Sequence, residues 1–158
     1  GPGIENPIAV MRADHDDRGA HVRVDVAADA EDALTRERVG AGLAEPEQAD
    51  DAYRSFKAGH IIADDAPKTI ADGLLVPLKD LTWHFVSNHV SEIYTASEQE
   101  IIDAMKLTWK RMKIVMEPSS AVTLATILAN PTVFKGRRVG VIITGGNVDL
   151  DRLPWMKG

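Results

Sequence analysis

The sequence predicts an α/β fold, and three observations carry that prediction. A short run of β-branched residues, Val139 to Ile143, lies between basic residues and a Gly-Gly turn, which predicts a strand buried on both faces, as in a parallel sheet. Two strongly helical segments precede it, and a further helix and strand precede those. The order helix, strand, helix, helix, strand favours α/β over a helical bundle. With 158 residues, the chain is long enough for one domain with its own core.

The composition excludes several classes of protein. The apolar fraction of 44% and the charged fraction of 27% are ordinary for a globular protein. A net charge of −6 argues against a nucleic-acid partner, and the absence of cysteine excludes disulfides and thiolate chemistry. No apolar run approaches the roughly 20 residues that span a bilayer, and no signal-peptide pattern is present, so we expect a cytoplasmic protein without a membrane partner. Gly1-Pro2 resembles the remnant of an expression tag.

Residues 1–42 form an atypical N-terminal segment, crowded with Asp, Arg, Ala and Val. His21 to Val26 alternates apolar and charged residues, which predicts an exposed or edge strand. Ala27 to Val39 could form a short polar helix. His15 stands among carboxylates and suggests either a metal cluster or a solvated charge run, and the charge run is favoured. Because large apolar residues are few here, the domain proper is expected to be residues 43–158.

The texture changes after Leu43. Glu45 should be extended because Pro46 follows it. Asp50 or Asp51 can begin a helix that runs to Phe56 or Lys57, with Gly59 as its stop. The remaining elements of this part are a Gly turn at 69–73, an amphipathic helix at 78–90, in which Leu81 and Phe85 are among the apolar positions, and a short strand at 92–95.

Ser97 and Glu100 form a capping box that begins the most secure helix of the chain. Its apolar face is expected to run from Ile101 to Val115 or Met116, and its three methionines are expected to fill the core. Pro118 suits the first turn of a second, strongly apolar helix, which should end at Asn130-Pro131 and be buried against the sheet.

The predicted strand at 139–143 leads into Thr144-Gly145-Gly146-Asn147, where the backbone becomes permissive and polar. Glycines allow close approach to a ligand, and ligands of open α/β sheets bind at the carboxyl ends of strands. A turn of this type also occurs wherever a chain simply reverses. The stretch by itself leaves a binding loop and a plain turn as alternatives.

Several segments, in this order, resemble serine racemase and the related threonine/serine and 3-hydroxyaspartate dehydratases. These are pyridoxal-phosphate enzymes of the tryptophan-synthase-β-like fold (fold type II). The resemblance runs from about Ala44 to Trp155 and implies the C-terminal part of a large domain in three layers, a mostly parallel sheet with flanking helices. The segments that carry it are Glu45–Asp51, Thr69–Gly73, Tyr94–Glu98 with Glu100-Ile101, Met112–Ser119 and Ile143–Asp149.

The resemblance also implies roles for particular residues. The Thr144 hydroxyl would bond the pyridine nitrogen of the cofactor, with Gly73 and Gly145 close to the cofactor. Glu117 would lie beside the pyridine ring, although it could merely cap the next helix. In the racemase-like members a divalent cation, Mg²⁺ or Ca²⁺, is bound at the positions of Glu45, Ala49 and Asp51, a hard oxygen set. Without the resemblance, these acidic residues would be interpreted as a solvated helix start.

Two parts of such an enzyme are missing. The family's cofactor-bearing lysine and its phosphate-binding glycine tetrad have no counterpart, and residues 3–42 contain no glycine run from which a phosphate cradle could be built. Lys57, in Ser55-Phe56-Lys57, imitates the lysine motif but falls by its order in an ordinary polar helix. Either a partner supplies these parts, or residues 3–42 come from an altered reading frame.

Two hypotheses follow. The first is the C-terminal portion of a pyridoxal-phosphate-dependent dehydratase (a lyase) or racemase (an isomerase), inactive as this chain alone. Its substrate would be a small amino acid such as serine, threonine or 3-hydroxyaspartate, and its partner a second chain carrying the N-terminal half. The second is a non-catalytic remnant of such an enzyme that associates with further copies of itself through an exposed sheet edge.

Overall fold

The computed structural model describes residues 8–16, 19–27, 41–64 and 66–156. Its strands are β1 (Ile8–Asp16), β2 (Gly19–Ala27), β3 (Ala41–Pro46), β4 (Val90–Ala96) and β5 (Arg138–Ile142). Its α-helices are α2 (Asp51–Ala58), α3 (Asp80–His89), α4 (Glu98–Met112), α5 (Pro118–Ala129) and α6 (Pro131–Phe134). Two 3₁₀ turns complete the list, η1 (Asp72–Leu74) and η2 (Pro154–Met156). No helix in these ranges has the length and apolarity needed to cross a membrane.

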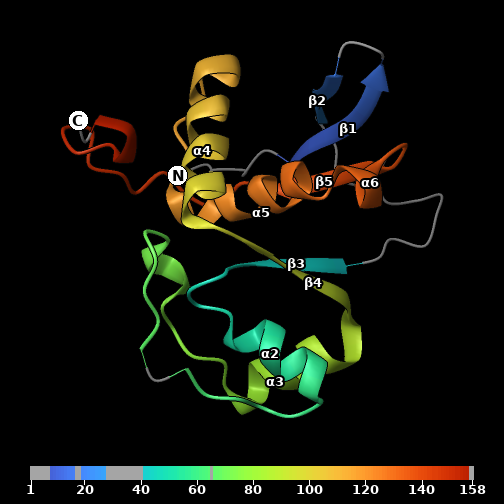
Figure 1. Ribbon diagram of the computed structural model, residues 1–158, viewed down its shortest axis with the longest axis vertical. Coiled ribbons are helices and arrows are strands. Elements are labelled where there is room, and N and C mark those ends of the chain that lie inside the picture. The colour runs from blue at the N-terminus through green and yellow to red at the C-terminus, as the bar shows by residue number, and fades with distance from the viewer. Residues whose placement is uncertain (1–7, 17–18, 28–40, 65, 157–158) are drawn as a thin grey trace, which may run out of the picture.

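A parallel pair of strands, β3 and β4, forms the middle layer of the larger part of the fold. Leu43 lies opposite Ile93, and Glu45 lies opposite Thr95. Figure 1 shows α5, with α4 beside it, on one side of this pair, and α2 with α3 on the other. The predicted α/β class, with a parallel sheet between helical layers, is confirmed. The strand at 92–95 is confirmed as part of β4, whereas β3 was predicted only as an extended backbone at Glu45.

A second sheet joins the two ends of the chain. Its strand order is β2-β1-β5, and both pairings are antiparallel. β2 lies at an edge among the described strands, which confirms the edge strand predicted at His21–Val26. The helix suggested for 27–39 falls almost wholly outside the described residues, and Ala27 itself ends β2.

The prediction that the last strand is buried on both faces was wrong. Val141 and Ile143 are only 2% and 7% exposed, but Ile142 between them is 60% exposed. Successive side chains of a strand point to opposite faces, so only the face that bears Val141 and Ile143 packs against the core. The strand pairs antiparallel with β1, and in the part of the chain that the structure describes no helix covers the face that bears Ile142.

The helix ends follow local chemistry. Gly59 ends α2 in the left-handed region, at φ 77°, where glycine carries no Cβ penalty. Both hydrogen bonds of the Ser97–Glu100 capping box are present at the start of α4. That helix ends earlier than its apolar face predicted: Lys113 takes φ 61°, so Val115 and Met116 lie beyond it. Pro118 is the first residue of α5, as expected.

The helix predicted at 78–90 exists as α3, but its apolar face is only partly used. Within α3 only Val86 is buried, and Leu81 and Phe85 are 74% and 56% exposed. Val86 packs with Ala52 and Ile93 in a small core that lies between α2, α3 and β4.

The main core lies on the other side of the parallel pair. It holds fully buried side chains of α4 and α5, including Ile101, Met105 and Val122, together with Val141 and Ile143. The C-terminal turn η2 closes one end of this core, because Trp155 packs edge-on against Trp109 with ring centroids 5.5 Å apart. The main core thus fixes the position of the end of β5 and of the amino end of α5, where the first candidate site lies.

Candidate functional site

The amino end of α5 gathers the residues implied for cofactor binding. The backbone N–H of Glu117 donates to the Gly145 carbonyl at 3.0 Å. The Glu117 carboxylate in turn accepts the backbone N–H of Asn147 at 2.9 Å. The Thr144 N–H donates to the Ser120 hydroxyl oxygen at 3.0 Å. The loop after β5 is therefore held against the first turn of α5 by three separate hydrogen bonds.

Two glycines fit this junction because they lack a side chain. A Cβ on Gly145 would overlap the Glu117 carboxylate, lying 2.7 Å from Oε1. A Cβ on Gly73 would lie 2.9 Å from the Ser119 hydroxyl oxygen, which accepts the Gly73 N–H at 3.0 Å. Gly73 and Gly145 are 72 positions apart in the sequence. The backbones of both glycines thus pack closely against the same turn at the amino end of α5.

Thr144 presents a hydroxyl at this junction. Its residue is exposed, and within the described ranges only its backbone N–H is engaged by the α5 turn. Glu117 is half-buried. The junction therefore brings the neutral hydroxyl of an exposed residue and the carboxylate of a half-buried residue onto two segments that are hydrogen-bonded to each other.

Sequence reasoning missed Ser119 and Ser120, which hold this arrangement. Replacing Ser120, which is 2% exposed, by alanine should cost about 1 kcal/mol, because the Thr144 N–H loses its acceptor. We expect faster hydrogen exchange at the Thr144 amide and a lower urea midpoint. Ser119→Ala is the matched control: the Gly73 N–H keeps a second acceptor, Asp72 Oδ1 at 2.9 Å, so its loss should be smaller. Equal losses in both variants would contradict this account.

Lys57 lies elsewhere. It belongs to α2, which packs on the opposite side of the β3–β4 pair from α5 (Figure 1). Its ammonium group bonds the Glu92 carboxylate at 2.6 Å and is half exposed. This hydrogen bond raises the pKa of Lys57. A raised pKa is the reverse of what activates a lysine as a nucleophile.

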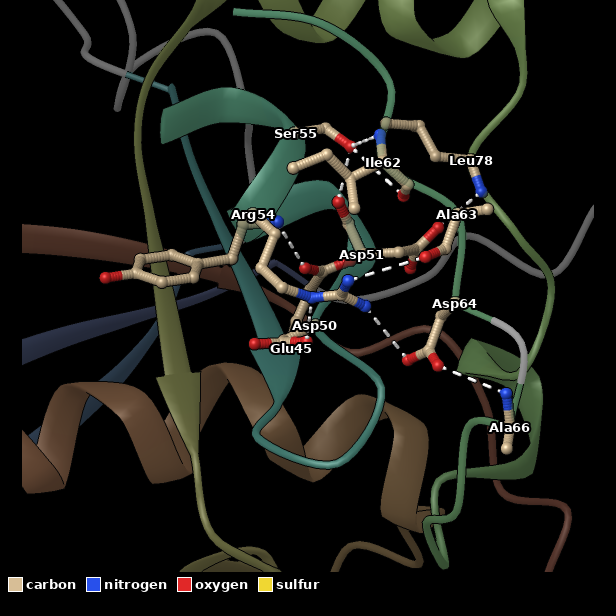
Figure 2. Close-up of polar contacts among 11 residues, drawn as sticks. Glu45, Asp50, Asp51, Arg54, Ser55, Ile62, Ala63, Asp64, Ala66 and Leu78 are labelled. Carbon is tan, nitrogen blue, oxygen red and sulfur yellow. Dashed lines mark hydrogen bonds and ion pairs between the residues drawn. The ribbon is translucent and has the colours of Figure 1, made fainter. Parts of the chain in front are cut away.

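Two of the residues implied for the cation, Glu45 and Asp51, lie at the first turn of α2 (Figure 2). Glu45 reaches it from the end of β3, where its carboxylate accepts the Tyr53 N–H at 2.7 Å. Asp51 is 6% exposed, and its Oδ2 accepts the Leu78 N–H at 2.7 Å. Ala49 is 1% exposed and sits in the turn between them.

The surroundings of Glu45 disfavour the charged form of its carboxyl group. Burial raises the pKa of its carboxyl from 4.5 to about 7, and the negative charges of Asp51 and Asp50 add to the rise, against the lowering effect of the hydrogen bond from Tyr53. A cation would relieve the repulsion between these carboxylates. In the described ranges no group of three or more acidic or histidine side chains converges on one point. The donor set that the resemblance implies has only two carboxylates, with the Ala49 carbonyl and water to complete it, a hard oxygen set of the kind that Mg²⁺ or Ca²⁺ accepts.

Arg54 is the cationic neighbour of this cluster, and sequence reasoning did not single it out. Its Nε donates to Asp50 Oδ1 at 2.7 Å, a pairing that the spacing of four residues on a helix could have signalled. Its other end reaches Asp64 at 3.3 Å. Figure 2 shows the guanidinium between these two carboxylates.

Comparison with known proteins places these features in a family. A family model described as "Pyridoxal-phosphate dependent enzyme" matches residues 27–145. The beta-hydroxyaspartate dehydratase of Paracoccus denitrificans is 84% identical over 112 residues, which cover 71% of this chain and 36% of that protein. The serine racemase of Dictyostelium discoideum is 47% identical over 114 residues, which cover 70% of this chain and 35% of the relative.

Solved structures of serine racemases also match this chain. The structure of maize serine racemase matches with a TM-score of 0.67 and 38% identity, covering 72% of this chain and 36% of its own. The crystal structure of the Dictyostelium discoideum serine racemase matches with a TM-score of 0.61 and 44% identity, covering 71% of this chain and 36% of its own. The chain thus spans about a third of the length of the curated relatives it matches, 35–36% for the two described above.

Proposed function

The chain belongs to the family of pyridoxal-phosphate-dependent enzymes, as its motifs predicted, and we propose that it is the C-terminal portion of a β-hydroxy amino acid dehydratase or racemase of that family. The observation that carries this proposal is the junction at the amino end of α5, where Thr144, Gly145, Glu117 and Gly73 meet. Among serine, threonine and 3-hydroxyaspartate, the 84% identity to a beta-hydroxyaspartate dehydratase favours 3-hydroxyaspartate as the substrate.

The residues at this junction suit the cofactor. When bound, pyridoxal phosphate supplies an electron-withdrawing ring that makes the substrate's α-proton removable. Thr144 would hold the pyridine nitrogen through its neutral hydroxyl, and Glu117 would stand beside the ring. Gly73 and Gly145 would lie close to the cofactor, and their lack of a side chain lets both segments pack against the α5 turn, because a Cβ at either position would collide with Ser119 or Glu117.

The covalent anchor of the cofactor is expected from outside the described residues. Lys57 is held by Glu92 on the far side of the parallel strand pair, and the described loops of this chain contain no glycine tetrad that could cradle a phosphate. We therefore propose that this chain alone does not convert the substrate and that a second chain with the N-terminal half completes the site.

Titration with pyridoxal phosphate tests this proposal. The isolated chain should show no visible absorption from lysine-bound cofactor, and a chain carrying the N-terminal half of a relative should bring it out, together with ammonia release from 3-hydroxyaspartate. Lys57→Ala should leave both results unchanged, as should Lys79→Ala, which controls for loss of a surface amine. A band in the isolated chain that Lys57→Ala abolishes would overturn the placement of the anchor.

A bound divalent cation is the second part of the proposal. Glu45, the Ala49 carbonyl and Asp51 would ligate Mg²⁺ or Ca²⁺ with waters completing the shell. The support comes from the half-buried Glu45 and the buried Asp51, whose negative charges repel each other, and from the raised pKa of Glu45. The cation would tie the end of β3 to α2 and so serve structure rather than chemistry.

A non-catalytic, self-associating remnant is the alternative, and one observation favours it. Ile142 is 60% exposed on β5 and Leu43 is 37% exposed on β3, so apolar strand surface faces solvent in both sheets. Sedimentation of the isolated chain discriminates between the two: a stable monomer would weigh against self-association, and a dimer that the N-terminal half does not displace would weigh against the split enzyme.

A further inference from the structure

The first turn of α2 carries more negative charge than the proposed cation needs. Glu45 and Asp51 are the proposed ligands, and Asp50 adds a third carboxylate next to them in the chain. The side chain of Asp50 is partly buried, at 26% exposed. Its charge contributes to the repulsion that Glu45 experiences. The partner of the Asp50 carboxylate therefore determines whether that carboxylate is available to ligate the cation.

Arg54 forms an ion pair with Asp50. Its Nε bonds Asp50 Oδ1 at 2.7 Å, a short charge-assisted hydrogen bond. Its Nη2 reaches Asp64 Oδ2 at 3.3 Å, and its Nη1 donates to the Ala63 carbonyl at 3.4 Å. The guanidinium is thus held from two sides and keeps a positive charge next to Asp50 and Asp51.

The segment that Arg54 contacts has an independent attachment. The Ile62 N–H donates to the Ser55 hydroxyl oxygen at 2.8 Å, and the Ser55 hydroxyl donates to the Asp51 carbonyl at 2.6 Å. Ser55 is fully buried. Removing Arg54 should therefore change the charge at the first turn of α2 without releasing residues 62–64 from the helix.

We propose that Arg54 lowers the affinity of the cation site, acting as an internal counter-charge that withholds the Asp50 carboxylate from the divalent cation. This inference rests on the proposed function, since it concerns the site formed by Glu45, Ala49 and Asp51. Arg54 is a tuning residue here and not a ligand. The cation it excludes is a hard, oxygen-preferring divalent ion that gains from each further carboxylate.

The test is a calorimetric Ca²⁺ titration of the whole 158-residue chain at fixed pH and ionic strength. Arg54→Gln makes the group one charge more negative and frees Asp50, so Ca²⁺ should bind roughly fivefold more tightly, an estimate from Coulomb attraction at a partly exposed site. Arg54→Lys keeps the charge and should stay near the parent. Asp50→Asn leaves Arg54 unbalanced and should weaken binding by roughly threefold. The double variant should return toward the parent affinity.

Asp64→Asn separates charge from geometry, because it removes the other partner of Arg54 and leaves Asp50 in place. Its affinity should stay within about twofold of the parent. An affinity gain in Asp64→Asn equal to that in Arg54→Gln would overturn the inference, as would unchanged or weaker binding in Arg54→Gln while the parent still binds. If neither the parent nor any variant binds Ca²⁺, and Glu45→Gln gives the same trace, the cation site itself is absent and the inference falls with it.

Discussion

At pH 8 and without divalent cations, the Glu45→Gln variant is expected to be more stable than the parent chain. The pKa of Glu45 is raised from 4.5 to about 7 in the folded chain, mainly by burial. A carboxyl with a raised folded-state pKa contributes stability that is fully present below the unfolded pKa and is lost as pH rises through the folded pKa. The parent should therefore lose stability between about pH 4.5 and pH 7, and remain at the lower value at pH 8.

The amide of glutamine stays neutral and can still accept the Tyr53 N–H. The shift corresponds to about 3 kcal/mol before allowance for solvent, and about 1–2 kcal/mol after it, because Glu45 is only half-buried. Urea unfolding at pH 5 and pH 8 measures the difference. The variant should gain at pH 8 and be near the parent at pH 5.

Ca²⁺ should reverse this order. The parent should gain stability from millimolar Ca²⁺ at pH 8, when Glu45 is ionised and able to ligate, and gain much less at pH 5, where protons compete. Glu45→Gln should gain almost nothing at either pH. Glu47→Gln, a change at an exposed neighbour two positions on, is the matched control and should behave as the parent does. Equal Ca²⁺ stabilisation of Glu45→Gln and the parent would remove Glu45 from the cation site.

Ile101→Ala should cause the largest loss of stability. Ile101 is fully buried in α4 and belongs to the main core with Met105 and Val122. Truncating a buried isoleucine loses transfer free energy and leaves a cavity, at a cost of about 3–4 kcal/mol. Total stabilities of small domains are about 5–15 kcal/mol, so the loss should be large in a urea or thermal melt.

Leu107→Ala is the control for Ile101→Ala. Leu107 lies on the same helix but is 37% exposed, and alanine is the better helix former, so its cost should stay below about 1 kcal/mol. If the two variants melted together, α4 would not be packed as described. A further sign of correct packing is the near-ultraviolet signal of the Trp109–Trp155 pair, which Ile101→Ala should weaken and Leu107→Ala should keep.

Local signals in the sequence predicted the helix ends well. The Ser97–Glu100 capping box, Pro118 at the start of α5 and Gly59 after α2 each act within one helical turn. A turn needs no distant partner to form, so its chemistry can be predicted from neighbouring residues alone. Lys113 is the exception, because nothing in its own chemistry indicates the positive φ at which α4 ends.

The exposed face of β5 and the half-used face of α3 could not be predicted in this way. An apolar run such as Val139 to Ile143 indicates a strand, but the layers that cover each of its faces depend on which other elements pack there. Ile142, Leu81 and Phe85 are all apolar and largely exposed. Their exposure depends on how separate helices and strands are arranged. The spacing of apolar residues along the sequence carries no information about that arrangement.

The amino-acid sequence by itself determined the α/β class, the family and the residue types of both candidate sites, because motifs and helix signals are written in neighbouring positions. Only the tertiary structure decided which groups come together at these sites. The Ser120 hydroxyl accepts the Thr144 N–H, and the Ser119 hydroxyl at the α5 turn accepts the Gly73 N–H. Arg54 forms ion pairs with Asp50 and Asp64. Most of these contacts join residues from separate elements. Their geometry arises when those elements pack, and packing depends on the shape and burial of the whole chain.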